Sequence, residues 1–411
     1  MVRVAVVGGG PAGMMAAYAA ASSAEVTLFE KNEKLGKKLF LTGKGRCNIT
    51  NARPQEDFFS NIPGNAKFLY SAFDAFSNND LIRLLNHHGL ATKVERGGRV
   101  FPASDKSSDV IKTLQNMLHS KKVQIQLGRH VQEILIRDGR VCGIKVEGKN
   151  IFFDKVILAC GGMSYPVTGS NGEGYEMARK AGHSMKELHP SLIPLVAKYP
   201  EICRKLMGLT LKNVRVTLQE KGKKRFESIG EMLFTYFGVS GPLILSASAH
   251  LSDYSFADTK ICIDLKPALD EVKLETRILR DFAEMPNNQL KITLQRLLPK
   301  MLCGEILEIA GLNGKKPVNF VTKEERKKLI SVIKNFCIPI CGTRDLEEAI
   351  VTRGGITLKE INASKMLSKL VPGLYFAGEM LDVDAYTGGY NLQIAFSTGY
   401  LAGRSAAENL D

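Results

Sequence analysis

The chain has 411 residues, of which 44% are hydrophobic and 24% are charged, a composition typical of a soluble globular protein with two or three domains. No run approaches the ~20 apolar residues of a membrane span, so we expect a cytoplasmic protein with no membrane partner. The eight cysteines contain no C-x-x-C pair, which argues against a disulfide scaffold and a metal site. We expect Cys337 and Cys341 to be buried apolar residues. The net charge of +14 indicates either polyanionic partners or a solvated Lys-rich surface, and we favour the second.

The first thirty residues contain a dinucleotide-binding fingerprint. A β-branched run, residues 2–7, ends in Gly8, Gly10 and Gly13, and an Ala-rich helix and a second strand lead to Glu30. The glycines permit a tight turn, a close approach of the backbone to a pyrophosphate, and close helix–strand packing. Glu30 can accept the hydroxyls of an adenosine ribose and would repel a 2′-phosphate. The pattern therefore predicts FAD or NAD rather than NADP.

Residues 31–51 form a polar, Gly-punctuated segment with six Lys and Arg. Because the segment directly follows Glu30, its charges and the Gly43-Lys44-Gly45-Arg46 backbone can reach the pyrophosphate and the flavin edge of the same ligand. The alternative is a solvated basic loop. The density of Gly, Thr and Asn favours a ligand loop.

The next part of the chain, to residue 162, reads as helices followed by a β-meander. The meander turns at Asp138-Gly139 and Glu147-Gly148 and fits a crossover between parallel strands. A buried strand, residues 154–159, then runs into Cys160 and Gly161. The expected helices are 66–76, 80–88 and 105–121, and the expected β segments are 123–127, 131–136, 141–146 and 149–153.

A second Gly-rich loop, residues 168–175, precedes a short helix, residues 176–181. Such a loop at a helix N-terminus can hold a substrate carboxylate or line the flavin, or it can be a capped surface turn.

The pattern changes between Leu192 and about Arg344, where alternating strands are followed by Lys-, Glu- and Leu-rich helices. This indicates an inserted β domain with its own helical subdomain, after which the first domain resumes. The expected strands are 209–218, 222–229, 232–236 and 260–265, and the expected helices are 271–282, 289–297, 304–310 and 323–335.

The C-terminal part begins with a strand that ends in Gly378-Glu379, followed by a polar loop, a Gly pair and a helix from about Asn391 to Glu408. In glutathione-reductase-type flavoproteins a strand ending in Gly-Asp binds the ribitol, and the next helix points its N-terminus at the flavin pyrimidine. Backbone N–H groups and the helix dipole would stabilise the negative charge that reduction builds there. Glu379 can replace the Asp of that motif and bind the ribitol.

Six motifs together resemble the bacterial YhiN/BaiN family of FAD-dependent proteins, over essentially the whole chain: Gly45-Arg-Cys-Asn48, Arg99-Val-Phe-Pro102, residues 168–175, Phe237-Gly-Val-Ser-Gly-Pro242, Thr352-Arg-Gly-Gly355 and residues 378–393. The resemblance implies an α/β fold, a Rossmann-type FAD-binding domain interrupted by an antiparallel β-barrel with a small helical subdomain. The implied boundaries are 1–191 and 348–411 for the FAD domain, 192–268 and 336–347 for the barrel, and 269–335 for the helices.

Members of that family include aminoacetone oxidases, reductases of conjugated C=C bonds in 3-oxo bile acids, and a protein linked to uridine reduction in ribosomal RNA. The resemblance therefore leaves three activities. We favour an NAD(P)H-linked reductase of an enone-type small molecule such as a 3-oxo bile acid or steroid. The alternatives are an amine oxidase that uses O₂ and an enzyme that uses flavin to reduce uridine. Because the chain has no second G-x-G-x-x-G, NAD(P)H would dock transiently. A nucleic-acid partner is possible but not favoured.

We expect the substrate to bind in the cleft between the FAD domain and the insertion, which would set specificity, with the Phe234–Pro242 loop over the flavin or else packed inside the barrel. Cys47 and Tyr390 are the candidate proton donors for C=C reduction. The residues expected to bind FAD are Gly8, Gly10, Ala12, Gly13, Glu30, Lys31, Lys38, Gly45, Arg46, Cys47, Asn48, Val131, Ala159, Cys160, Gly161, Gly378, Glu379, Gly389, Tyr390, Asn391 and Leu392.

Overall fold

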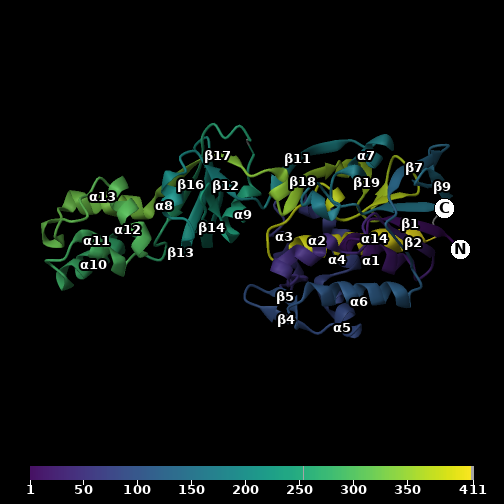
Figure 1. The fold of residues 1–411 in the computed structure, drawn as a ribbon, viewed down its shortest axis with the longest axis horizontal. Coiled ribbons are helices and arrows are strands. Elements are labelled where there is room, and N and C mark those ends of the chain that lie inside the picture. Colours follow the sequence, from purple (N-terminus) through teal and green to yellow (C-terminus); the bar gives the residue numbers. More distant parts are fainter. Residues whose placement is uncertain (253, 409–411) are drawn as a thin grey trace. The chain divides into compact units, whose positions relative to one another are not determined.

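The computed structural model describes residues 1–252 and 254–408. The chain divides into two compact units (Figure 1). Unit 1 contains Met1–Ser191 and the chain from Asp345 onward, and unit 2 contains Leu192–Arg344. The chain therefore leaves unit 1 once and returns to it once, so unit 1 is assembled from two segments that are distant in the sequence.

A seven-stranded sheet forms the centre of unit 1, with the strand order β19-β20-β21-β10-β1-β2-β6. The five strands from β21 to β6 are parallel, which confirms the predicted Rossmann-type architecture. The four strands β21, β10, β1 and β2 are rich in β-branched and aromatic residues and are largely buried, as expected when both faces of a parallel sheet are covered, whereas the edge strand β6 is mostly exposed. The strands are β1 Arg3–Val7, β2 Glu25–Glu30, β6 Gln124–Leu127, β10 Lys155–Leu158, β19 Ile361–Asn362, β20 Leu367–Ser368 and β21 Leu374–Phe376.

Two helices, α1 (Pro11–Ala20) and α14 (Tyr390–Ala407), pack against each other through small residues. A Cβ atom at Gly399 would lie 2.2 Å from the carbonyl oxygen of Ala12, and one at Gly403 would lie 2.1 Å from that of Ala16. Larger side chains would force the two backbones apart. This contact joins the N-terminal fingerprint helix to the C-terminal end of the chain.

The predicted β-meander is present as a three-stranded sheet, β7-β8-β9. Both of its turns have the conformation that their sequences predict, because Asp138 and Gly139 have φ values of 50° and 73°, and Glu147 and Gly148 have φ values of 48° and 78°. The sheet contains β7 Val131–Arg137, β8 Arg140–Val146 and β9 Lys149–Phe152. The other strands of unit 1 are β3 Thr50–Asn51, β4 Thr92–Glu95, β5 Arg99–Pro102, β11 Met185–Ser191 and β18 Val351–Ile356, and its other helices are α2 Lys37–Leu41, α3 Gln55–Phe59, α4 Tyr70–Ala75, α5 Asn78–His87, α6 Ser107–Ser120 and α7 Glu173–Lys180.

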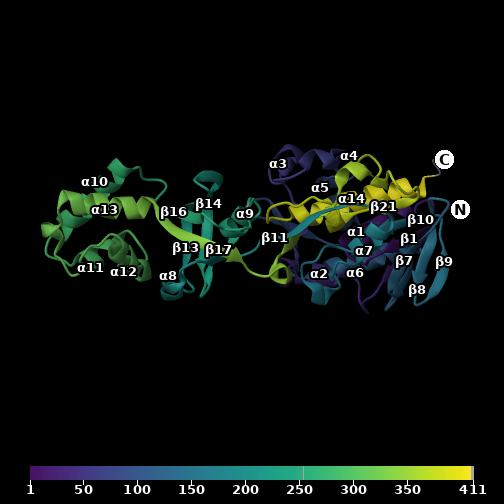
Figure 2. The same ribbon diagram turned by 90° about the horizontal axis from the view of Figure 1, so that it is seen from above.

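Unit 2 is built around a closed antiparallel barrel with the order β12-β15-β14-β13-β16-β17, which confirms the predicted inserted barrel. Helices α10 to α13 gather at one end of this unit (Figures 1 and 2). The strands are β12 Leu195–Ala197, β13 Thr210–Glu220, β14 Lys223–Phe234, β15 Gly238–Ser240, β16 Thr259–Asp264 and β17 Phe336–Thr343, and the helices are α8 Glu201–Lys205, α9 Pro242–Ser248, α10 Glu271–Glu284, α11 Leu290–Thr293, α12 Lys300–Ile309 and α13 Lys323–Lys334.

Two details of unit 2 differ from the sequence prediction or refine it. The strands predicted at 222–229 and 232–236 form the single strand β14, which continues through Gly230 because this residue pairs with Val214 of β13. The Phe234–Pro242 loop is divided between two environments. Phe234 is buried and lies 6.3 Å from Phe336, centroid to centroid, whereas Tyr236 is 57% exposed.

The prediction that Cys337 and Cys341 are buried apolar residues is wrong. Cys337 forms a disulfide with Cys262, and Cys341 is exposed. The antiparallel register of β16 and β17 places Cys262 directly opposite Cys337. Because 75 residues separate the two in the chain, their spacing gave no sign of the pairing.

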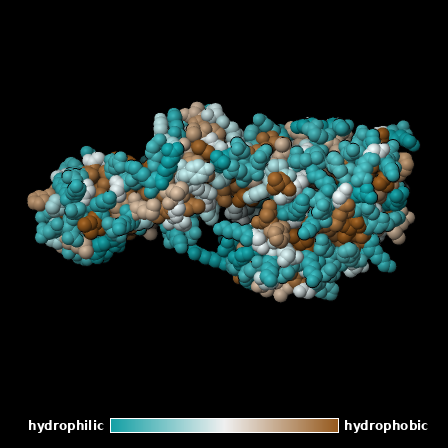
Figure 3. Space-filling model, in the orientation of Figure 1, coloured by the Kyte–Doolittle hydropathy of each residue, from teal (hydrophilic) through white to brown (hydrophobic). Residues whose placement is uncertain are grey.

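The surface of each unit is mostly hydrophilic on the face that Figure 3 shows, with scattered hydrophobic side chains. Among the described residues, no helix is long and apolar enough to cross a bilayer.

Candidate active site

The fingerprint loop joins β1 to α1 and has the geometry that its glycines predict. Gly8 has φ 106°, and a Cβ there would lie 2.4 Å from the carbonyl oxygen of Ala159. A Cβ at Gly13 would lie 1.8 Å from the carbonyl oxygen of Gly8, so this position also excludes a side chain. A Cβ at Gly10, in contrast, would meet no atom within 4 Å. The space beside Gly10 is where the backbone can approach a pyrophosphate.

The N-terminus of α1 is suited to bind an anion. Its N-cap residue, Gly10, makes no side-chain cap, and the turn contains no acidic residue. The N–H groups of this turn and the positive end of the helix dipole are therefore available to an anion.

Glu30, at the end of β2, is buried beside this loop. Its Oε2 accepts a hydrogen bond of 2.7 Å from the backbone N–H of Gly9, and its Oε1 accepts bonds of 2.8 and 2.7 Å from the backbone N–H and side-chain amide of Asn32. These bonds fix the carboxylate at the carboxyl end of the sheet. Since an ionised carboxylate can accept about four hydrogen bonds, Oε2 keeps capacity for a ribose hydroxyl.

Glu379 lies at the end of β21, in a short 3₁₀ turn (Gly378–Met380), and joins three other segments of unit 1. Its carboxylate forms an ion pair of 2.7 Å with Lys38 and accepts hydrogen bonds of 3.0 Å from Ser164 Oγ and 2.8 Å from the backbone N–H of Thr352. Lys38 also donates to Ser164 Oγ at 2.6 Å. The acid is therefore held rigidly at the position expected to meet the ribitol.

The N-terminus of α14 is suited to bind an anion for the same reasons as that of α1. Gly389, its N-cap residue, has φ 97° and makes no side-chain cap, and the first turn has no acidic residue. Asn48, with its amide oriented to satisfy both neighbours, accepts from the Gly389 N–H at 3.0 Å and donates to the Thr50 carbonyl at 3.0 Å. Asn391 holds the preceding loop by accepting from the backbone N–H of Ala385 at 2.9 Å and donating to its carbonyl at 2.7 Å.

These features fit FAD. The open space at Gly10, the buried acid Glu30 and the open N-termini of α1 and α14 match the pyrophosphate, ribose and pyrimidine of the cofactor, and Glu379 matches its ribitol. When bound, FAD supplies two-electron transfer as hydride. The protein contributes fixed donors and dipoles, which need no reorganisation when charge develops.

Several of the other residues expected at the cofactor are engaged with protein partners. Lys31 pairs with Glu173 of α7 at 2.8 Å. Arg46 binds Glu95 and Asp105, and its guanidinium stacks 4.2 Å from the centroid of Phe101. The sequence pattern did not indicate this ion-pair cluster, because its acids lie about 50 and 60 residues downstream.

The remaining expected residues are distributed around the central sheet and α14. Ala159, Cys160 and Gly161 follow β10 beside Gly8, and the Cys160 thiol has its pKa raised to about 12 by burial. Val131 is buried in β7 of the meander, and Leu392 is half-buried in the first turn of α14.

Cys47 and Tyr390, the predicted proton donors, both lie near the N-terminus of α14, and both are enclosed. Cys47 is 0% exposed, has φ 59°, and its pKa is raised to about 12 by burial. Tyr390 is 3% exposed, packs edge-on against Phe58 at a centroid distance of 4.8 Å, and has its pKa raised by burial. Their catalytic roles stay predictions.

Sequence reasoning missed two acids in the loop between Glu379 and α14. Asp384 is 5% exposed and accepts a 2.6 Å hydrogen bond from Ser191 Oγ, and burial raises its pKa. Asp382 is half-buried, and burial raises its pKa as well. The sequence did contain a sign of these acids, because two carboxylates stand in a Gly-rich loop directly after Glu379, the acid expected to bind the ribitol.

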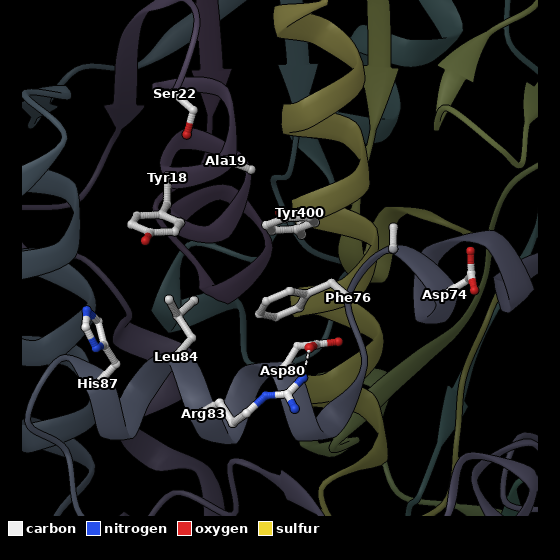
Figure 4. Close-up of a pocket in the computed structure, with 11 residues that line it drawn as sticks. Tyr18, Ala19, Ser22, Asp74, Phe76, Asp80, Arg83, Leu84, His87 and Tyr400 are labelled. Atoms are coloured by element: carbon white, nitrogen blue, oxygen red, sulfur yellow. Dashed lines mark hydrogen bonds and ion pairs between the residues drawn. The ribbon is translucent and has the colours of Figure 1, made fainter.

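A separate cavity of about 640 Å³ lies in unit 1 between α1, α5 and α14 (Figure 4). Phe76 and Tyr400 stack in it at a centroid distance of 4.5 Å, and Arg83 pairs with Asp80 at 2.5 Å. Tyr18 lies in the last turn of α1, and Tyr400 lies ten residues, about 15 Å, along α14 from its first residue. This cavity is therefore remote from the helix N-termini that we expect to bind FAD.

The model of the HI0933-like protein Rossmann domain family matches residues 2–405. The chain belongs to the HI0933-like family. This confirms the resemblance seen in the sequence motifs, and the family implies FAD as the cofactor. The protein is a flavin-dependent oxidoreductase of this family.

Two curated relatives match this HI0933-like chain over nearly its whole length. The 3-dehydro-bile acid Δ(4,6)-reductase of Clostridium scindens is 33% identical over 415 residues, which cover 99% of this chain and 100% of the relative. The ribosomal RNA dihydrouridine synthase of Escherichia coli is 30% identical and covers 96% of this chain and 95% of the relative.

Solved structures share the fold of this HI0933-like protein. The 3-ketosteroid-Δ4-(5α)-dehydrogenase of Rhodococcus jostii RHA1 has a TM-score of 0.52 and 16% identity, covering 99% of this chain and 97% of that one. The 3-ketosteroid Δ1-dehydrogenase of Sterolibacterium denitrificans has a TM-score of 0.53 and 14% identity, covering 99% and 100%. At these identities the likeness concerns the fold alone.

Proposed function

We propose that this protein is an FAD-dependent reductase of a C=C bond conjugated to a carbonyl group, with NAD(P)H as the transient hydride donor. The open helix N-terminus at Gly389 carries the proposal, because it provides N–H groups and a dipole for the negative charge that builds at the flavin pyrimidine on reduction. The substrate we favour is an enone-type small molecule such as a 3-oxo bile acid or steroid.

The names of the two relatives support the same chemistry. The bile acid reductase is named for Δ4,6 bonds in a 3-dehydro, that is 3-oxo, compound, so its Δ4 bond adjoins a carbonyl. Dihydrouridine is uridine in which C5=C6, conjugated to the C4 carbonyl, has been reduced. Both reactions add a hydride and a proton across a conjugated C=C bond. Reduction of such a bond is therefore favoured over the amine oxidation by O₂ that remains the first alternative.

The second candidate, reduction of uridine in RNA, is favoured by one observation. Residues 192–344 contain 25 Lys and Arg but 16 Asp and Glu, so this unit accounts for +9 of the chain's net charge of +14. A basic surface can bind phosphates without sequence preference. We further propose that unit 2 selects the substrate, since unit 1 is committed to the cofactor.

The test is anaerobic oxidation of NADH and NADPH by the FAD-loaded protein, with 3-oxo-4-ene steroids and bile acids, with unmodified ribosomal RNA, and with aminoacetone plus O₂ in a parallel aerobic assay. We expect oxidation of the nicotinamide to depend on the enone, with the saturated ketone as product by mass spectrometry. Turnover with aminoacetone and O₂ alone would refute the proposal, and dihydrouridine in the RNA would select the second candidate.

A further inference from the structure

The loop of residues 380–388 connects the two groups that would hold the flavin. It begins after Glu379, the ribitol acid, and ends at Gly389, the N-cap of α14. The loop is fixed against β18, because Leu381 forms a parallel bridge with Ile356 and a Cβ at Gly355 would lie 2.6 Å from the Met380 carbonyl oxygen. The side chains of this loop are therefore held in defined positions between the two ends of the expected flavin site.

Asp382 is the half-buried acid of this loop. Asn65 donates through its side-chain amide to the Asp382 carbonyl oxygen at 2.8 Å and to Asp382 Oδ2 at 3.1 Å, and the backbone N–H of Gly354 also bonds the carboxyl group. Gly354 has φ 92°, a conformation that a glycine adopts without strain. The carboxyl group is thus oriented by donors from two separate segments.

Four charged or titratable groups, from three neighbouring elements and from the loop itself, interact electrostatically with Asp382. They are Arg353 of β18, Lys186 of β11, Tyr175 of α7 and Asp384 of the loop itself. Burial outweighs the attraction of the two cations and raises the pKa of Asp382, so the carboxyl group holds its proton to higher pH than an exposed aspartate does.

Asp382 differs from the two donors expected from the sequence in one decisive respect. Cys47 and Tyr390 are enclosed by protein, whereas Asp382 retains exposed surface. A carboxylic acid is also a far stronger acid than a thiol whose pKa is about 12. A proton donor must be reprotonated after each turnover, and the exposed surface of Asp382 gives its carboxyl group access to solvent.

We propose that Asp382 is the general acid of C=C reduction, which donates the proton to the carbon next to the carbonyl while the neighbouring carbon receives hydride. This inference rests on the proposed function. The C=C bond gains one hydride, for which a nicotinamide-type donor would be the reductant, and one proton from the Asp382 carboxyl group. The Asp382 carboxylate that remains then takes a proton from solvent, which restores the acid.

The first experiment measures the two half-reactions separately by stopped-flow absorbance of the flavin. Asp382→Asn should keep its FAD and its rate of reduction by NAD(P)H, but its rate of reoxidation by the enone should fall by about 10²–10⁴-fold. Asp382→Glu, which keeps an acid, should recover part of that loss. Asp138→Asn is the matched control, because Asp138 is an exposed turn residue whose φ of 50° suits asparagine.

The second experiment needs no cofactor. Infrared difference spectra between apo wild type and apo Asp382→Asn, recorded as a pH series, should show one protonated-carboxyl band that persists to higher pH than the band of an exposed aspartate. In the wild type the rate of reoxidation should stay constant at low pH and fall as pH rises through the raised pKa, whereas Asp382→Asn should lack this dependence.

The outcomes separate the two proposals. A wild type that reduces no enone refutes the proposed function, and the role of Asp382 with it. If the wild type reduces the enone and the Asp382→Asn variant is reoxidised by the enone at a rate within about twofold of the wild-type rate, the role of Asp382 is overturned and the proposed function stands. If Asp382→Asn fails to bind FAD, the infrared pH series and the Glu variant decide. A carboxyl band of Asp382 that disappears at the pH of an exposed aspartate, or an inactive, FAD-replete Glu variant, overturns the inference.

Discussion

The backbone N–H of Thr352 donates a 2.8 Å hydrogen bond to Oε1 of Glu379. The hydroxyl oxygen of the same threonine accepts bonds of 2.8 and 3.1 Å from the backbone N–H groups of Met163 and Ser164. One buried residue of β18 therefore orders both Glu379, the acid expected to bind the ribitol, and the loop that follows β10. This arrangement joins three segments that are distant in the sequence.

Thr352→Val should destabilise unit 1 and weaken FAD binding. The change keeps the bond to Glu379 but leaves the buried N–H of Ser164 and the partly buried N–H of Met163 without their acceptor, and a buried N–H without an acceptor costs about 1–3 kcal/mol. Urea unfolding of the apoprotein and fluorescence titration with FAD would measure both effects. Thr352→Ser retains the hydroxyl and is the control. Equal stability of the Val and Ser variants would contradict the assigned role.

Alanine at Gly13 should destabilise the apoprotein, whereas alanine at Gly10 should not. At Gly13 the new Cβ meets the backbone of Gly8, so we expect a lower Tm and loss of FAD. At Gly10 the Cβ meets nothing and the φ of −79° suits alanine, so the apoprotein should keep its Tm. Calorimetry without flavin tests this, and a destabilised Gly10→Ala protein would show that the turn is misdescribed.

Cys47→Ser and Tyr390→Phe test the proton donors expected from the sequence. If either residue donates the proton, its variant should lose turnover while keeping FAD. Because both side chains are enclosed and burial raises both pKa values, we expect smaller losses than for Asp382→Asn. The three variants are compared by their kcat values, measured at equal flavin occupancy. Unchanged kcat in both variants would remove them as candidates.

Reduction of the Cys262–Cys337 disulfide should lower the stability of unit 2. The bond closes a 75-residue segment that includes α10 to α13, and cross-links of this kind contribute about 2–4 kcal/mol by restricting the unfolded chain. Denaturation with and without dithiothreitol measures the effect, and Cys341→Ser is the control at an exposed thiol. If alkylation before reduction labelled all eight cysteines, the bond would be absent.

His183 should make the protein acid-sensitive. Its side chain is fully buried, lies 2.8 Å from Ser368 Oγ and 3.1 Å from Glu360 Oε2, and has its pKa lowered from 6.5 by burial. Below about pH 6.5 the unfolded chain binds a proton that the folded chain resists, so stability falls as pH falls. His183→Gln should show a flatter stability profile between pH 7 and 5.5. A profile parallel to that of the wild type would contradict this.

The sequence predicted those features whose cause is local. The Gly8/Gly10/Gly13 spacing requires one particular turn, and Asp138-Gly139 requires left-handed backbone. Each of these turns can therefore be predicted from a few neighbouring residues. The alternation of apolar residues predicted the long strands β13 and β14 and the strand β16, but not β12, β15 and β17. The break expected near Gly230 was wrong, because pairing with β13 keeps β14 continuous.

Features that depend on distant pairing could not be predicted. The Cys262–Cys337 bond follows from a strand register, and the ion pairs of Arg46 follow from how β4 and β5 return to its loop. Asp382 is the clearest case at the site. Its partners Asn65 and Gly354 lie about 320 and 30 residues away, and its significance follows from burial, which no local pattern reports.

The pairing of β21 with β10, and of α14 with α1, has a consequence for biosynthesis. When the ribosome has completed residue 344, strand β10 still has an unpaired edge and α1 an uncovered face, because both partners lie in the final segment. The FAD site cannot close until that segment has left the exit tunnel. Cofactor capture should therefore follow synthesis of β21 and α14, and a nascent chain stalled before β21 would expose an unpaired sheet edge prone to aggregation.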